Sequence, residues 1–197
     1  MLDLAIDPQE LLVDQSLVLT VIGLDRPGIV ERVAQTVAEH GGNWVESRMA
    51  KLAGRFAGVV RVDVPARELQ SLKAALNRLE AEGLMLSLQP ATEADAGVEH
   101  EQTVEINLSY VGHDREGLVR EVSHALANAG VNVLELTTRV YSAPMSGELL
   151  FEALTRLAVP VNVDLPTLRE TLNELGHRLD LDMTFGQEET PDAPGAL

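Results

Sequence analysis

The hydrophobic positions of the first ninety residues change their spacing along the chain. Residues 16–22 are rich in β-branched side chains and alternate in part between apolar and polar positions, which is typical of a strand. Ile29, Val33 and Val37 then recur at helical spacing, and the two glycines at 41–42 end that pattern. The spacing therefore predicts a strand followed by an amphipathic helix.

Three further strands and a second helix are expected before residue 90. Residues 43–51 and 55–64 have the composition of two strands joined in a hairpin. Within residues 67–82, four leucines keep helical spacing, and Gly83 follows as a stop signal. Residues 84–88 return to an extended pattern. The predicted order of elements is βαββαβ.

This pattern occurs twice. Shifting the sequence by 89 positions aligns residues 23–30 (GLDRPGIV) with residues 112–119 (GHDREGLV). Of the 25 pairs formed by residues 23–47 and 112–136, ten are identical. A repeat near 90 residues is longer than a solenoid repeat, so it indicates a duplicated domain. The second copy contains several extra residues around 142–147.

The second copy repeats the order of the first. Its elements are predicted at residues 104–111, 118–129, 132–141, 148–158, 165–175 and 179–185. The order is that of an α+β, ferredoxin-like sandwich, in which two helices cover one face of a four-stranded antiparallel sheet. We predict an N-terminal extension (1–15), two tandem domains (16–90 and 103–186), a linker (91–102) and a disordered tail (187–197).

The charge of the chain argues against direct nucleic-acid binding. Thirty-one acidic residues stand against 15 basic ones, and the formal net charge is −16. The basic residues are scattered along the chain, so a basic stripe is not expected. An acidic surface repels the phosphate backbone that supplies most nucleic-acid affinity. We expect no direct contact with nucleic acid.

Several classes of chemistry lack their sequence signals. The chain has no cysteine, which excludes disulfides and thiolate sites. Zinc-protease, nucleophile-elbow and P-loop motifs are absent, so we predict neither an enzyme nor a bound metal or cofactor. The first residues do not resemble a secretory signal, and no apolar run approaches the roughly 20 residues of a membrane span. We expect a cytoplasmic protein without membrane contact.

The loop DRPG at residues 25–28, followed by a Val/Ile-rich helix, a glycine pair and Asn43, resembles the ACT domain, a ligand-sensing module of amino-acid metabolism. Two such domains, with YSAPMSGELLF at residues 141–151, resemble the glycine cleavage system transcriptional repressor family. That resemblance implies an amino-acid-responsive repressor without a DNA-binding domain. It implies contact with a LysR-type transcriptional activator and glycine as the signal. A homodimer is also expected.

The duplicated loop is the expected ligand site. The site residues are Asp25, Arg26, Pro27, Gly28, Ile29 and Asn43 in the first copy, and Asp114, Arg115, Gly117, Leu118 and Asn132 in the second. Backbone N–H groups at a helix start attract a carboxylate, and Asp25 or a neighbouring carbonyl would take the ammonium group. Glu116 replaces Pro27 in the second copy, which removes a rigid turn and adds a negative charge. We therefore expect the first copy to be the better site.

Three alternatives stay open. Asp25 and Pro27 suit a helix cap and first turn, and Asn43 and Asn132 suit a strand entry, so these residues have a purely structural explanation. An acylphosphatase-like enzyme uses an Arg and an Asn on this fold, for which Arg26 and Asn43 are the candidates. The glycine-rich phosphate cradle of such enzymes is absent, and Asp25 would repel a phosphate. The third alternative is an interaction module that binds no small ligand.

Overall fold

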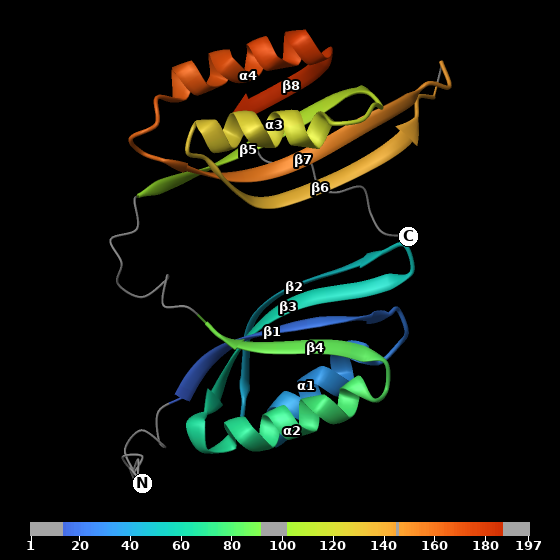
Figure 1. The fold of residues 1–197 in the computed structure, drawn as a ribbon, viewed down its shortest axis with the longest axis vertical. Coiled ribbons are helices and arrows are strands. Elements are labelled where there is room, and N and C mark those ends of the chain that lie inside the picture. The colour runs from blue at the N-terminus through green and yellow to red at the C-terminus, as the bar shows by residue number, and fades with distance from the viewer. Residues whose placement is uncertain (1–13, 92–101, 145, 187–197) are drawn as a thin grey trace, which may run out of the picture. The chain divides into compact units, whose positions relative to one another are not determined.

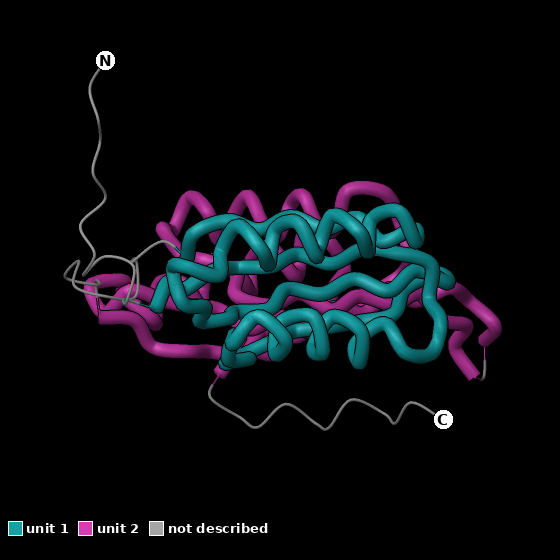
Figure 2. Tube along the Cα trace, turned by 90° about the horizontal axis from the view of Figure 1, so that it is seen from below, with its two compact units in different colours: residues 1–93 teal, residues 94–197 magenta. Residues whose placement is uncertain are grey.

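The computed structural model describes residues 14–91, 102–144 and 146–186. The chain divides into two compact units, residues 1–93 and 94–197, which are coloured separately in Figure 2. The predicted tail and nearly all of the predicted linker and N-terminal extension lie outside the described residues. Within the described ranges, none of the helices has the length and apolar character needed to cross a membrane.

The first unit has the predicted βαββαβ order (Figure 1). Its elements are β1 (Asp14–Leu24), α1 (Ile29–Glu39), β2 (Asn43–Leu52), β3 (Arg55–Pro65), the short helix η2 (Ala66–Glu68), α2 (Leu69–Glu80) and β4 (Leu84–Pro90). The strands lie in the order β2-β3-β1-β4, and every neighbouring pair is antiparallel. Both helices cover the same face of the sheet.

The second unit repeats this arrangement. Its elements are β5 (Thr103–His113), α3 (Leu118–Asn128), β6 (Asn132–Ser142), β7 (Leu149–Pro160), α4 (Leu165–Leu179) and β8 (Leu181–Gly186). The strand order is β6-β7-β5-β8, again antiparallel throughout. The predicted fold, two ferredoxin-like sandwiches, is therefore confirmed.

Alternation along the strands separates the two faces of each sheet. In β1, Leu17, Leu19 and Val21 are buried against the helices, while the residues between them point to the other face. In β5, Tyr110 occupies the place of Val21 and is the largest fully buried side chain of the described residues. We call the sheet face without helices the open face of each unit (Figure 1).

Candidate functional site

The duplicated loops have the same backbone conformation. Gly28 and Gly117 are the N-caps of α1 and α3, with φ of 89° in both and ψ of 0° and −1°. Residues other than glycine rarely adopt this φ, so the turn depends on the glycine. The turn therefore has the same conformation with Glu116 as with Pro27. The alternative in which Asp25 caps the helix is wrong, because the N-cap of α1 is Gly28 and the helix has no side-chain cap hydrogen bond.

Backbone hydrogen bonds join each loop to the neighbouring hairpin. The Asp25 N–H donates to the Gly54 carbonyl oxygen over 3.0 Å, and the Asp114 N–H donates to the Leu149 carbonyl oxygen over 2.9 Å. The duplication has therefore kept this contact, although the hairpins differ in length.

The two loop arginines hold the loops to the segment between the second helix and the last strand of the first unit, and to the end of the second helix in the second unit. The Arg26 guanidinium donates to the Glu82 carbonyl oxygen over 3.1 Å, and Arg115 donates to the Leu179 carbonyl oxygen. Glu82 and Leu179 each lie two residues before the leucine that begins the last strand. These contacts give Arg26 and Arg115 a structural role.

The side chain of the loop aspartate has different surroundings in the two units. Asp25 forms an ion pair with Lys51 of β2, with 2.5 Å between Oδ2 and Nζ. The equivalent of Lys51 in the second unit is Val140, since both residues lie opposite a phenylalanine of the neighbouring strand. Among the described residues, Asp114 has no ion pair. The carboxylate expected to bind an ammonium group is thus already neutralised in the first unit.

A second ion pair closes the corner of the first unit beside this loop. Both carboxylate oxygens of Glu82 lie 2.5 Å from the guanidinium nitrogens of Arg32 on α1. In the second unit Glu121 takes the place of Arg32. Glu121 binds its sequence neighbour Arg120 over 2.6 Å, and this hydrogen bond and charge lower the pKa of Glu121. That pair joins no two elements, so the corner lacks this bridge.

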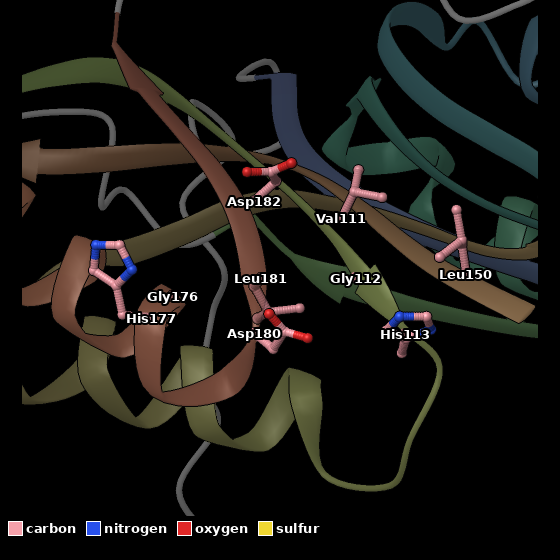
Figure 3. Close-up of a pocket in the computed structure, with 9 residues that line it drawn as sticks. All are labelled: Val111, Gly112, His113, Leu150, Gly176, His177, Asp180, Leu181 and Asp182. Carbon is pink, nitrogen blue, oxygen red and sulfur yellow. The ribbon is translucent and has the colours of Figure 1, made fainter.

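The second unit has a hollow of about 420 Å³ at this corner (Figure 3). The hollow is lined by Val111, Gly112, His113, Leu150, Gly176, His177, Asp180, Leu181 and Asp182. Its volume lies in the range of roughly 300–1,000 Å³ that is typical of small-molecule sites. The lining side chains come from the end of β5, from β7, from α4 and from the α4–β8 turn with the start of β8.

Four polar side chains of the hollow can recognise opposite charges. Asp180 and Asp182 offer carboxylates that accept hydrogen bonds from an ammonium group. His113 and His177 offer ring N–H donors to a carboxylate. The φ of Asp180 is 52°, a left-handed conformation that is uncommon outside glycine, asparagine and aspartate. Groups of three or more residues suited to holding a metal ion are absent from the part of the chain that the structure describes.

Asn43 lies at the opposite end of the sheet from the loop. It pairs with Asp63, whereas the loop end of the sheet is marked by Leu52, opposite Arg55. The nine residue steps along β2 amount to about 30 Å at the usual rise per residue. A single small ligand therefore cannot contact both Asp25 and Asn43 within the unit, and the expected common site is corrected.

Asn132 repeats this placement in the second unit. It pairs with Ala158, while Asp114 follows the far end of β5, where His113 pairs with Leu150. In the first unit the same separation keeps Arg26 and Asn43 apart. The acylphosphatase alternative needs these two residues in one site.

None of the predicted site residues lines the hollow, although His113 precedes Asp114 directly. His177, Asp180 and Asp182 lie more than 60 residues beyond β5 in sequence. Pairing of Val111 with Asp182 brings them to the loop. A linear motif does not reveal that pairing, so the sequence offered no signal for these three residues.

Comparison with known proteins places the chain among ACT-domain proteins. An ACT-domain family model matches residues 15–89. A UPF0237 protein of Methanococcus maripaludis is 31% identical over 78 residues, which are 38% of this chain and 87% of that protein. A UPF0237 protein of Methanopyrus kandleri is 45% identical over 47 residues, which are 24% of this chain and 52% of that protein.

Two solved structures resemble nearly the whole chain. An unknown protein from Galdieria sulphuraria has a TM-score of 0.74 and 31% identity, covering 88% of this chain and 98% of its own. A protein described as a candidate glycine cleavage system transcriptional repressor has a TM-score of 0.64 and 21% identity, covering 88% of this chain and 96% of its own. At 21% identity, the second likeness establishes the fold only.

Proposed function

The chain belongs to the UPF0237 family of ACT-domain proteins, and from this premise we propose that it is an amino-acid-responsive regulatory protein and not an enzyme. The observation that carries the proposal is the hollow beside the duplicated loop of the second unit. Two carboxylates and two imidazoles are among the side chains that line it, and a carboxylate with an imidazole suits the two opposite charges of an amino acid.

The ligand we propose is a small amino acid, with glycine first. Glycine is supported by the resemblance to the glycine cleavage repressor family and by the fold shared with the candidate repressor. A hollow of about 420 Å³ also has space for a side chain. Alanine, serine and threonine therefore belong in the same test as glycine.

The regulatory output we propose is contact with a protein, a LysR-type transcriptional activator, in the cytoplasm. The net charge of −16 opposes direct binding to DNA. A mobility-shift titration at physiological salt should show no complex with the isolated protein. A sequence-specific shift without an activator would contradict this output.

Calorimetry and thermal shift on the full chain test the ligand site. A ligand that binds only the folded state raises the melting temperature by mass action. We expect Asp180→Asn to weaken amino-acid binding at least about tenfold, because one ammonium acceptor loses its charge. Asparagine tolerates the left-handed conformation of residue 180, so the fold should be retained.

Asp25→Asn is the matched control, and it should leave amino-acid binding intact. Loss of binding in Asp25→Asn together with full binding in Asp180→Asn would instead place the site at the first loop. If the wild type binds no amino acid, the ligand-responsive function fails and the interaction module is favoured. Hydrolysis of acyl phosphates by the purified protein would overturn the non-enzymatic assignment.

A further inference from the structure

The four polar residues of the hollow have no polar counterpart in the first unit. Strand pairing and the shared leucines of the second helices set the correspondence between the two corners. Asp182 lies opposite Val111, for example, and Met85 lies opposite Ile22 at the same place of the first sheet. The first unit has Leu24, Ala81, Gly83 and Met85 where the second has His113, His177, Asp180 and Asp182. The polar character of the hollow therefore belongs to the second copy.

The four side chains are free to meet a ligand. None of them forms an ion pair or a side-chain hydrogen bond with another residue that the structure describes. Of the two arginines closest to them in sequence, Arg115 donates to the Leu179 carbonyl oxygen. The charge of the other, Arg178, acts on Glu121 of α3. The described residues that line the hollow include no lysine or arginine, so nothing in the lining offsets the charges of the two aspartates.

The polar groups of the hollow fall into two parts (Figure 3). In this view Asp180 lies between His113 and His177, whereas Asp182 stands apart from them beside Val111, its partner in β5. A carboxylate and an imidazole suit the ammonium and carboxylate groups that every amino acid carries. Asp180 and the imidazoles therefore suit the common part of the ligand, and Asp182 is left to face its side chain.

We propose that Asp182 makes the hollow discriminate by the charge of the ligand's side chain, so that neutral amino acids bind and acidic ones are rejected. A negatively charged side chain beside Asp182 would place like charges together, which is unfavourable where no cation separates them. A neutral side chain avoids this repulsion. The inference rests on the proposed function, because it concerns the side chain of the amino acid proposed to bind in the hollow.

Amino acids that differ almost only in charge give the sharpest measurement. Glutamate and glutamine have nearly the same shape, as do aspartate and asparagine. Calorimetric titration of the full chain at about pH 8, where histidine side chains are ordinarily uncharged, compares the two members of each pair. At about 0.1 M salt we expect the acid to bind at least about tenfold more weakly than its amide. Glycine is the reference ligand.

Two variants test the role of Asp182 in this discrimination. Asp182→Asn removes the charge, and Asp182→Met introduces the residue of the first unit at the same place. Both should bring the affinities for acid and amide to within about threefold of each other, because the repelling charge is gone. Residue 182 is exposed, so the fold should be retained, which circular dichroism checks.

Glu170→Gln is the matched control for net charge. Glu170 is exposed on α4 and lies outside the lining of the hollow, and its substitution changes the charge of the chain by the same amount as Asp182→Asn. The discrimination between acid and amide should persist in this variant. A loss of discrimination equal to that in Asp182→Asn would assign the effect to the charge of the whole chain and overturn the proposal.

Three further results would overturn the proposal. The first is equal binding of acid and amide by the wild type. The second is unchanged discrimination in both Asp182 variants. The third is binding of glycine without binding of either amide, because size and not charge would then decide. In all three cases a neutral amino acid still binds and the proposed function stands. If no amino acid binds, both proposals fail together.

Discussion

In the first unit, Lys51 neutralises Asp25 and Arg32 joins Glu82 across two elements. In the second unit the equivalents of Lys51 and Arg32 are Val140 and Glu121, and a hollow lies at that corner. The shared backbone depends on few groups: a left-handed glycine, one backbone N–H and one arginine. The comparison teaches that a duplicated fold can keep its loops while every charged partner around them changes.

The open faces differ in the opposite sense. The first unit, whose corner is closed by ion pairs, exposes Leu24, Leu52, Val59 and Met85 on its open face. The second unit, with the hollow, has an open face on which Arg139 pairs with Glu152 and Arg156 pairs with Glu105 and Glu135.

The largest expected effect tests how tightly the two corners are built. A Cβ on Gly112 would lie 2.7 Å from the Asp180 carbonyl oxygen, and a Cβ on Gly23 would meet chiefly the end of the Leu84 side chain. Backbone atoms move aside less easily than the end of a side chain. Gly112→Ala should therefore lower the free energy of unfolding by about 3 kcal/mol, and Gly23→Ala by about 1 kcal/mol. Urea unfolding followed by Trp44 for the first unit and by the tyrosines for the second measures both. Equal losses of stability in the two variants would contradict the expected difference between the two corners.

A pH effect should be confined to the second unit. Burial raises the pKa of Tyr110 to about 12, while an unfolded tyrosine titrates near 10. Between these values the unfolded state releases the proton first, so the free energy of unfolding falls as pH rises, by up to about 3 kcal/mol. In Tyr110→Phe the free energy of unfolding should fall less steeply with rising pH. Hydrogen exchange in both units measures this. An unchanged pH slope in that variant would assign the decline to other groups.

Thr155 allows a substitution that should stabilise the second unit. It is buried, its Oγ1 has no hydrogen-bond partner among the described residues, and its equivalent in the first unit is Val60. Thr155→Val should raise the free energy of unfolding by about 1 kcal/mol, because an unsatisfied hydroxyl is removed at constant shape. Val60→Thr should destabilise the first unit. If denaturation shows a loss in Thr155→Val, a partner for the hydroxyl is implied.

The smallest expected effect concerns the ion pair at the closed corner. Glu82→Gln should cost less than about 1 kcal/mol, since both side chains are partly exposed. The loss should shrink in high salt. Glu121→Gln is the control, because the Glu121 pair joins no two elements, and its effect should be smaller still. A salt-independent loss in Glu82→Gln would indicate a packing role.

The duplication, the element order and the two turn glycines could be predicted from the sequence. Strand alternation, helical spacing and the left-handed turn are local properties, expressed within a few residues of the chain. Asp25 shows where local reasoning stops: its position suits a helix cap, but its carboxylate binds Lys51, which the fold brings from a neighbouring strand.

The pairing of distant strands decided the rest. It placed Asn43 about 30 Å from the loop that precedes it in sequence, and it brought His177, Asp180 and Asp182 to His113. It also placed Met85, Ile22, Ala57 and Ala50, which come from four strands, in one row across the first sheet. Register is a nonlocal property, because each pairing depends on the packing of the whole sheet against its helices. For this reason the linear pattern determines which fold forms, while the tertiary structure determines which side chains meet.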